Sequence, residues 1–245
     1  TRGLTGWSAA RVCFSVVRIV RTALRGTGQG MLTTSAKRIL IADDHEVVRS
    51  GLRSILESHE DWEVVGEAEN GKDAISLIVD TCPDVAIVDY SLPLINGVEV
   101  TRSVKARQLP TEVLIFTMHD SDDLVKESFK AGAKAFLLKS DAKRSLVTAV
   151  ASLFVHKPFF TGIVSEKMLA SFLSSNEAPK VVISPRERMV IQLISEGYSN
   201  KGMSKVLNLS IKTIETHRAS AMRKLDVNST AGLVRYAIRN RLVEP

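Results

Sequence analysis

Residues 38–44 are Arg38-Ile39-Leu40-Ile41-Ala42-Asp43-Asp44, a short apolar run that ends in two acidic residues. Four consecutive apolar residues are typical of a strand that is buried on both faces of a parallel sheet. The same pattern recurs in Val85-Ala86-Ile87-Val88-Asp89, again with an aspartate at its end. The two stretches predict neighbouring strands whose carboxyl ends carry acidic side chains.

Apolar runs and helix-period segments alternate around these two stretches. Strands are expected at 38–42, 62–67, 85–88, 112–116 and 135–138. Helices are expected at 47–56, 71–79, 98–107, 122–131 and 140–154. This order predicts an α/β fold, a doubly wound parallel five-stranded sheet with helices on both faces. In such a sheet the ligand site lies at the carboxyl ends of the strands.

The composition is that of a globular protein with unevenly distributed charge. Of 245 residues, 44% are hydrophobic and 24% charged, which excludes general disorder. Residues 31–160 carry 15 basic and 20 acidic side chains, whereas residues 181–245 carry 11 basic and 5 acidic. The asymmetry suggests a C-terminal part that faces nucleic acid and a middle part that handles cations or phosphate. Two solvated surfaces of opposite charge are the alternative.

Cysteine and hydropathy counts exclude other classes of protein. Cys13 and Cys82 are too few for a disulfide framework or for a thiolate metal cluster within one chain. No apolar run reaches the roughly 18 residues that a membrane-spanning helix needs.

Residues 1–30 differ from the rest of the chain. They contain five arginines and no acidic residue, and they end in a glycine-rich stretch that Met31 follows directly. We expect a poorly ordered basic leader, with Met31 as the natural start. A short amphipathic helix at a membrane surface is the alternative.

Polar side chains are expected at the ends of four strands of the predicted sheet. Asp43 and Asp44 follow the first strand, Asp89 the third, Thr117 the fourth and Lys139 the fifth. Carboxylates from two strands repel each other unless a hard cation joins them, and Mg²⁺ prefers such oxygen ligands. A hydroxyl and an ammonium group beside them suit the oxygens of a phosphoryl group, so Asp89 is the candidate nucleophile. Taken singly, each residue would be a helix cap, a solvated charge or a packed side chain.

These residues resemble the receiver domain of bacterial two-component response regulators, over about residues 36–155. The matching stretches are Ile39-Leu40-Ile41-Ala42-Asp43-Asp44-His45, Asp89-Tyr90-Ser91-Leu92-Pro93 with Gly97, Phe116-Thr117 and Phe136-Leu137-Leu138-Lys139. The resemblance implies a flavodoxin-like fold and a phosphoacceptor at Asp89. The residues that it assigns to Mg²⁺ are Asp44, Asp89, the carbonyl of Ser91 and, through water, Asp43. It also assigns Thr117 and Lys139 to the phosphoryl oxygens. Phe136 is assigned as the aromatic switch residue, whose rotamer reports the position of Thr117.

The last part of the chain predicts a small all-α domain of four helices. Ser184-Pro185-Arg186-Glu187 is a capping box that begins the first helix, and Gly197 suits its end. Ser199, Ser210 and Ser229 are expected to cap the other three. The turn Asn208-Leu209-Ser210 has the length of the turn in a helix-turn-helix motif.

The third of these helices, expected at 211–225, has two distinct faces. The stripe that should pack inward is Ile214, His217, Ala221 and Leu225. The opposite stripe is Lys212, Thr216, Ala219 and Arg223, in which cations alternate with small residues. Such a face can approach the floor of a DNA groove while its cations hold phosphates. A solvated basic face on a small bundle is the alternative.

The same segment resembles the LuxR-type DNA-binding domain, over about residues 181–243, which together with the receiver indicates the NarL/FixJ class. The motifs are Ser184-Pro185-Arg186-Glu187, Glu196–Lys201, Lys212–Arg218 and Arg223-Lys224-Leu225. The residues that the resemblance assigns to base edges are Glu215, Thr216 and Ala219. Those that it assigns to phosphates are Lys201, Lys212, Thr213, Arg218 and Arg223. Gly202 and Ser204 depart from the family pattern, and a glycine inside a helix costs about 1 kcal/mol against alanine.

The expected function is a cytoplasmic transcription regulator rather than an enzyme, phosphorylated on Asp89 by a sensor histidine kinase. Phosphorylation would then free or dimerise a C-terminal domain that binds double-stranded DNA, and RNA polymerase is a further expected partner. The expected organisation is a leader at 1–30, a receiver at 31–155, a linker at 156–181 with one helix at 165–173, and a helix-turn-helix domain at 182–245.

Two other functions are compatible with parts of the sequence. A phosphatase resembling haloacid dehalogenases would use the same aspartyl phosphate, but it needs an acid two residues later, where Ser91 stands. A protein-interaction adaptor would use the last domain to bind protein instead of DNA. Salt-dependent binding to duplex DNA would distinguish it from a transcription regulator.

Overall fold

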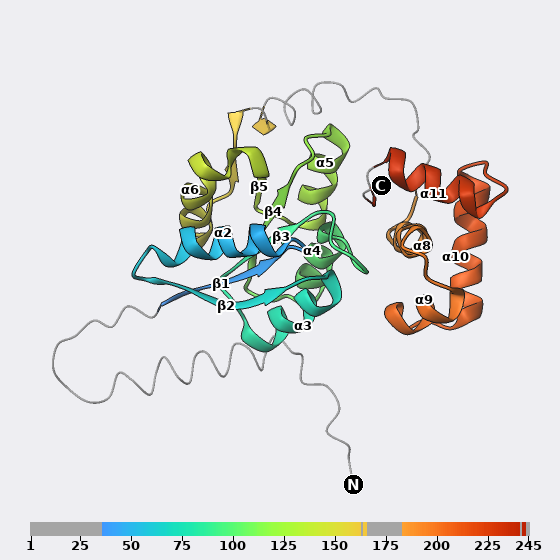
Figure 1. Ribbon diagram of the computed structural model, residues 1–245, viewed down its shortest axis with the longest axis horizontal. Coiled ribbons are helices and arrows are strands. Elements are labelled where there is room, and N and C mark those ends of the chain that lie inside the picture. Colours follow the sequence, from blue (N-terminus) through green and yellow to red (C-terminus); the bar gives the residue numbers. More distant parts are fainter. Residues whose placement is uncertain (1–35, 163, 166–182, 241, 244–245) are drawn as a thin grey trace, which may run out of the picture.

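The computed structural model describes residues 36–162, 164–165, 183–240 and 242–243, which form two units (Figure 1). The N-terminal unit comprises the described residues up to 165, and the C-terminal unit those from 183 onward. The expected leader and the helix expected at 165–173, apart from Ser165, lie outside the described residues. Within the part that the structure describes, no helix has both the length and the apolarity needed to cross a bilayer.

The N-terminal unit contains a parallel sheet in the order β2-β1-β3-β4-β5-β6. Its strands are β1 (Lys37–Ala42), β2 (Trp62–Ala68), β3 (Val85–Asp89), β4 (Glu112–Thr117), β5 (Ala135–Leu138) and β6 (Phe159–Phe160). The first five confirm the predicted strands. The sixth was not predicted, because two residues between Pro158 and Gly162 are too few to show a strand period. β6 pairs with β5, so the sheet extends into the segment expected to be a linker.

Five helices cover the two faces of this sheet. α2 (Glu46–Glu57) and α6 (Ala142–Phe154) pack on one face, with a 3₁₀ turn (Lys139–Asp141) before α6. α3 (Gly71–Thr81), α4 (Gly97–Ala106) and α5 (Asp122–Ala131) pack on the other (Figure 1). The doubly wound fold is therefore confirmed.

Side chains of β1 alternate between two hydrophobic cores. Leu40 and Ala42 point toward α3, α4 and α5, whereas Ile39 and Ile41 point toward α2 and α6. All four are buried, and each large aliphatic side chain contributes about 1.5–3 kcal/mol when it is removed from water. Burial on both faces explains why this strand is continuously apolar in the sequence.

Two glycines let helices begin directly against the loop that follows Asp89. A Cβ atom on Gly97 would lie 2.3 Å from the carbonyl oxygen of Asp89. A Cβ atom on Gly71 would lie 1.7 Å from the carbonyl oxygen of Ile95. Both contacts are with backbone, which cannot rotate away, so only glycine fits and the first turns of α3 and α4 hold the loop in place.

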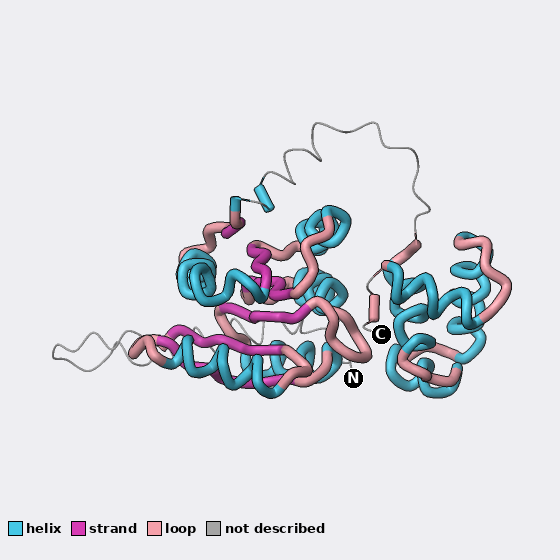
Figure 2. Tube along the Cα trace, turned by 45° about the horizontal axis from the view of Figure 1, so that its top comes forward, coloured by secondary structure: helices cyan, strands magenta, loops and turns pink. Residues whose placement is uncertain are grey.

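The C-terminal unit consists of helices and loops without strands in its described residues (Figure 2). The helices are α8 (Pro185–Ser195), α9 (Asn200–Leu207), α10 (Ile211–Lys224) and α11 (Thr230–Arg239). The predicted caps are confirmed, because the side chains of Ser184, Ser199, Ser210 and Ser229 each accept a backbone hydrogen bond from the first turn. Gly197, with φ of +85°, follows the end of α8 as expected.

Candidate functional site

The carboxyl ends of β1, β3 and β5 bring two carboxylates and one ammonium group together. Lys139 Nζ lies 2.7 Å from Asp43 Oδ2 and 2.9 Å from Asp89 Oδ2. Asp43 and Asp89 are only 1% and 3% exposed. Asp43 Oδ2 accepts no well-aligned hydrogen bond but lies within ion-pair distance of Lys139, so its charge is compensated. The predicted convergence of these strand ends is confirmed.

Two residues of this site had no role in the sequence prediction. His45 Nδ1 lies 2.9 Å from Asp44 Oδ1 and 3.4 Å from Asp43 Oδ1, so the imidazole joins the two acidic residues. Arg49 donates to the carbonyl oxygen of Asp43 over 2.7 Å and is buried. Arg49 lies on the apolar stripe of α2 with Leu52, and a cation in that position is the signal that sequence inspection could have used.

Burial raises the pKa of Asp89 to about 6, because a carboxylate loses its hydration inside the sheet edge. The ammonium group of Lys139 lowers the pKa of Asp89 in part, and the nearby charge of Asp43 raises it further. Burial lowers the pKa of Lys139, but the attraction of Asp89 and Asp43 outweighs it, so the net shift is upward. Two crowded carboxylates with one ammonium group leave negative charge that a further cation would stabilise.

The donor set at this edge fits a divalent cation that prefers oxygen. Ligand atoms of Asp43, Asp44, His45 and Asp89 all lie within 4.8 Å of one another. Three of the four residues are carboxylates, the ligand type that Mg²⁺ and Ca²⁺ take. The structure therefore provides an acidic cluster whose carboxylates suit a hard divalent cation.

The other predicted residues lie around this cluster. The backbone N–H of Ser91 is 3.4 Å from Asp89 Oδ1. Thr117 ends β4 and is fully buried, and its Oγ1 accepts a hydrogen bond from the N–H of His119 over 3.1 Å. Phe136 is also fully buried and belongs to the core on the α3–α5 face.

The predicted DNA-contacting residues lie on the surface of α9 and α10. Lys201, Lys212, Glu215, Thr216, Ala219 and Arg223 are exposed, and Thr213 and Arg218 are half-buried. On the opposite side of α10, Ile214 and Ala221 are fully buried, as the two-stripe pattern predicts. α10 lies on the side of the C-terminal unit that faces away from the N-terminal unit (Figure 1). No described residue therefore covers the exposed stripe.

A cavity of about 610 Å³ between α9, α10 and α11 brings two of the predicted phosphate contacts together. Lys201 and Arg218 both line it, beside Tyr198. Arg218 also donates to Thr230 Oγ1 over 2.6 Å, which holds the guanidinium at the start of α11. The unusual Ser204 donates to the carbonyl oxygen of Leu209 over 2.5 Å and so braces the turn between α9 and α10.

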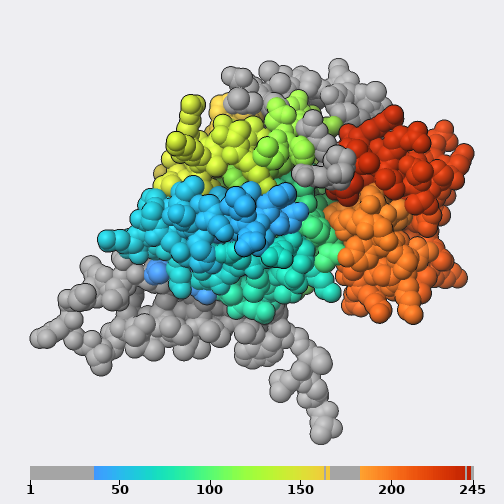
Figure 3. Space-filling model, in the orientation of Figure 1, coloured from blue at the N-terminus to red at the C-terminus, as the bar shows by residue number. Residues whose placement is uncertain are grey.

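The two units touch (Figure 3), and α8 of the C-terminal unit contacts the loop that follows Asp89. Gln192 Nε2 donates to the carbonyl oxygen of Leu92 over 2.9 Å, and Asn96 Nδ2 donates to Gln192 Oε1 over 3.2 Å. The N–H of Leu94 lies 3.2 Å from both carboxylate oxygens of Glu196. We call these contacts between α8 and the β3–α4 loop the junction.

An ion pair extends the junction to α5. Arg188 of α8 pairs with Glu127 of α5. Burial raises the pKa of Tyr90, the residue that follows Asp89, to about 12, and the guanidinium of Arg188 partly opposes that shift. Sequence inspection missed the junction. Its one signal was Gln192, a polar residue in the middle of the apolar stretch of α8.

Two family models match the chain. A model described as "response regulator receiver domain" matches residues 39–151. A model described as "bacterial regulatory proteins, luxR family" matches residues 181–237. The two matches coincide with the sheet that carries the acidic cluster and with the helices that carry the exposed basic stripe.

Relatives of known name share this two-part organisation. The chain is 36% identical to the oxygen regulatory protein NreC of Staphylococcus epidermidis over 216 residues, which is 84% of this chain and 99% of NreC. It is 34% identical to the transcriptional regulatory protein LiaR of Bacillus subtilis over 208 residues, with the same coverage. Among solved structures it resembles RcsB of Salmonella enterica serovar Typhimurium, bound to the promoter rprA in the presence of phosphomimetic BeF3-. That match has 28% identity and a TM-score of 0.58 over 82% of this chain and 98% of RcsB.

Proposed function

The chain belongs to the bacterial two-component response regulators that join a receiver domain to a LuxR-type DNA-binding domain, and we propose that phosphorylation of Asp89 controls its action on DNA. The observation that carries the proposal is the position of Lys139 between Asp43 and Asp89 at the carboxyl edge of the sheet. A buried aspartate with an ammonium group beside it can accept a phosphoryl group whose oxygens that ammonium then pairs with.

The proposed transfer uses one carboxylate oxygen of Asp89 as the nucleophile. This oxygen of Asp89 forms the new bond to phosphorus. The bond between phosphorus and the nitrogen of the kinase histidine breaks, and the electron pair of that bond stays on the nitrogen. Lys139 neutralises the added charge, and the hydroxyl of Thr117 is assigned to a second phosphoryl oxygen.

Asp44, Asp89 and the carbonyl of Ser91 are the residues proposed to hold Mg²⁺, with Asp43 acting through water. When bound, the cation would offset the charge of the carboxylates and of the phosphoryl oxygens. The composition of the acidic cluster supports this assignment. His45 lies beside Asp43 and Asp44 and would help to hold both carboxylates in place.

The C-terminal unit is proposed to bind double-stranded DNA through α10. Glu215, Thr216 and Ala219 would face base edges, and the predicted cations of α9 and α10 would hold phosphates. The exposure of these residues supports the assignment. Because the stripe is already exposed while the two units are docked, we propose that phosphorylation acts by pairing two copies of the chain on adjacent half-sites instead of by uncovering α10.

The proposed route from Asp89 to the C-terminal unit is the junction. Leu92, Leu94 and Asn96 lie three to seven residues after Asp89 and contact α8 directly. A shift of this loop on phosphorylation would change the docking of α8. We further propose that a sensor histidine kinase is the phosphodonor, that the protein is cytoplasmic and that it contacts RNA polymerase on DNA. We also propose that it has no catalytic turnover, because Ser91 stands where a phosphatase would need an acid.

The test is uptake of acid-labile phosphate from acetyl phosphate with Mg²⁺ present. Asp89→Asn should abolish uptake by removing the nucleophile, and Asp44→Ala by removing a metal ligand. Asp80→Asn, an exposed aspartate on α3, serves as the matched control and should label normally. Undiminished labelling of Asp89→Asn would show that another residue accepts the phosphoryl group.

A further inference from the structure

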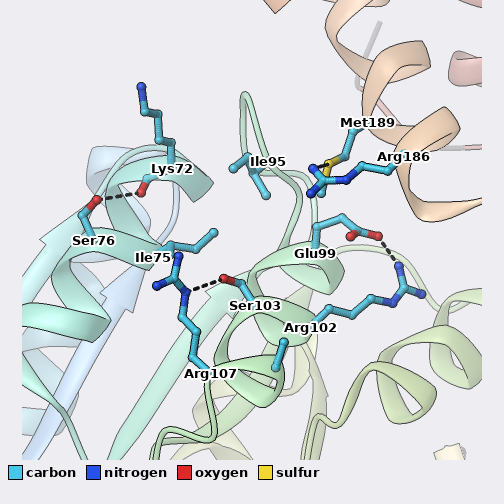
Figure 4. Close-up of a pocket in the computed structure, with 11 residues that line it drawn as sticks. Lys72, Ile75, Ser76, Ile95, Glu99, Arg102, Ser103, Arg107, Arg186 and Met189 are labelled. Carbon is cyan, nitrogen blue, oxygen red and sulfur yellow. Dashed lines mark hydrogen bonds and ion pairs between the residues drawn. The ribbon is translucent and has the colours of Figure 1, made fainter. Parts of the chain in front are cut away.

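A pocket of about 620 Å³ lies where α8 meets α3 and α4 (Figure 4). Both units line it, because Arg186 and Met189 come from α8 and the remaining residues come from the N-terminal unit. Its size is that of a site for a small organic molecule. The carboxylates at the strand ends do not line it, so it is separate from the proposed phosphorylation site.

The pocket carries an excess of positive charge. Lys72, Arg102, Arg107 and Arg186 line it, against the single carboxylate of Glu99. Glu99 is 4% exposed and pairs with Arg102, so these two charges cancel. The other three cations form no ion pair with a described residue: Arg107 donates to Ser103 Oγ over 3.2 Å, and Arg186 contacts Met189 Sδ over 3.6 Å. Two uncompensated guanidinium groups, those of Arg107 and Arg186, therefore face one hollow and attract anions, whereas the ammonium group of Lys72 points away from it (Figure 4).

The inner surface of the pocket is apolar. Ile75 and Ile95 are half-buried and Met189 is buried, so aliphatic groups lie between the cations. Figure 4 shows Arg107 and Arg186 on opposite sides of this hollow, with Ile75 and Ile95 near it. An inorganic anion would leave the apolar surface uncovered. A molecule with an apolar body and an acidic group satisfies both parts, because guanidinium groups bind phosphate and carboxylate through paired hydrogen bonds.

We propose that this pocket binds a small organic anion of about the size of a mononucleotide, which Arg107 and Arg186 contact from opposite sides. Arg107 belongs to the N-terminal unit and Arg186 to the C-terminal unit, so both hold the ligand only while α8 is docked. The ligand therefore stabilises the docked arrangement and opposes any change that separates the units. This is an input separate from phosphorylation.

The experiment is isothermal titration calorimetry of the full chain with three probes: AMP, 1-naphthyl phosphate and 1-naphthoate. At least one should bind one-to-one with a Kd below about 1 mM, whereas uncharged adenosine should not bind. Arg107→Ala and Arg186→Ala should each weaken that probe about tenfold, because each removes charge-assisted hydrogen bonds. Arg144→Ala is the matched control, an exposed arginine on α6, which covers the opposite face of the sheet.

Two further variants separate this site from the others. Asp89→Asn should bind the probe normally, so a failure of the phosphorylation proposal leaves this result intact. Gln192→Ala should weaken the probe, because it loosens the docking of α8 that completes the pocket. Absence of binding by all three probes would overturn the proposal. Unchanged binding by Arg186→Ala would also overturn the proposal, provided that the circular dichroism spectrum of this variant matches that of the parent chain.

Discussion

Gln192 donates its side-chain amide to the backbone carbonyl of Leu92 over 2.9 Å, and this bond joins the middle of α8 to the loop after Asp89. Gln192 is 1% exposed, and its amide oxygen accepts a hydrogen bond from Asn96. A buried amide that is satisfied on both sides by another part of the chain fixes one docking register. A net hydrogen bond contributes only about 1 kcal/mol, whereas a buried partner left alone costs about 1–3 kcal/mol.

Replacing Gln192 by alanine should therefore loosen the junction without unfolding either unit. The carbonyl of Leu92 and the amide of Asn96 would lose their partner, at a cost of about 1–3 kcal/mol of docking free energy. Hydrogen exchange should become faster at 91–96 and along α8. Asn228→Ala, an exposed amide outside the junction, should change neither region. Unchanged exchange in Gln192→Ala would mean that other contacts set the docking.

Lys212 and Thr216 should affect DNA binding in different ways. Lys212→Ala should weaken specific and non-specific duplexes alike and reduce the salt slope by about 1, because it removes one phosphate contact. Thr216→Ala should leave the slope unchanged and relax preference at one operator position by about 1–3 kcal/mol. The Thr216 hydroxyl already donates to the carbonyl of Lys212 over 2.9 Å, so its lone pairs and methyl group remain for a base.

The measurement is a salt titration of each variant on an operator and on a scrambled duplex. If Thr216→Ala changes the slope while Lys212→Ala changes only sequence preference, α10 enters the groove in another orientation. Ser210→Ala is a useful third variant. It removes the cap of α10, so it should cost about 1 kcal/mol of stability before it affects recognition.

The C-terminal unit should lose stability in acid through Glu187. Burial would raise the pKa of Glu187, but hydrogen bonds from Lys224, Ser184 and Ser220 outweigh it and lower the pKa to about 2. Since the unfolded value is about 4.3, the ionised group contributes stability above that pH. The contribution is lost as the pH falls toward 2.

Urea unfolding of the full chain, followed at several values of pH, tests this expectation. Glu187→Gln should be less stable at neutral pH and should lose less stability between about pH 5 and pH 2. Glu215→Gln, an exposed carboxylate on α10, is the control and should retain the pH dependence of the parent chain. An equal pH dependence in Glu187→Gln and the parent chain would assign the acid sensitivity to other groups.

Gly202→Ala should stabilise the C-terminal unit by up to about 1 kcal/mol, because alanine favours a helix over glycine. The new Cβ atom would lie 3.2 Å from Cδ1 of Tyr198, whose side chain is 37% exposed and can move. Gly232 is the third residue of α11, as Gly202 is of α9. A Cβ atom on Gly232 would lie 3.0 Å from Cβ of Val227, which is fixed to the backbone and cannot move away. Thermal unfolding should show a gain only for Gly202→Ala, and equal effects at both glycines would contradict the packing argument.

Local signals were sufficient to predict most elements of the fold. Buried strands such as 85–88 are continuously apolar, and the helices of the C-terminal unit begin at Ser184, Ser199, Ser210 and Ser229, each a preferred cap. The strand β6 escaped prediction because Phe159 and Phe160 owe their strand conformation to pairing with β5 and not to a pattern of their own.

The site was predictable only in part. Asp43, Asp89 and Lys139 could be placed together, because the carboxyl ends of parallel strands meet at one edge. The junction could not be predicted, since Gln192 and Leu92 are 100 positions apart and the polarity of Gln192 does not identify its partner. The pocket between the units depends on that docking, so it too could not be predicted from sequence.

The open position of α10 has a consequence for the amount of protein in the cell. Since the residues assigned to base edges are exposed in the docked chain, we expect a single unphosphorylated copy to meet a half-site without rearrangement. The proposed pairing of two copies would then raise occupancy by making the second contact intramolecular, at a high effective concentration. Overproduction would achieve the same occupancy by mass action. A cell that accumulates this protein should therefore respond in part as if the signal were present.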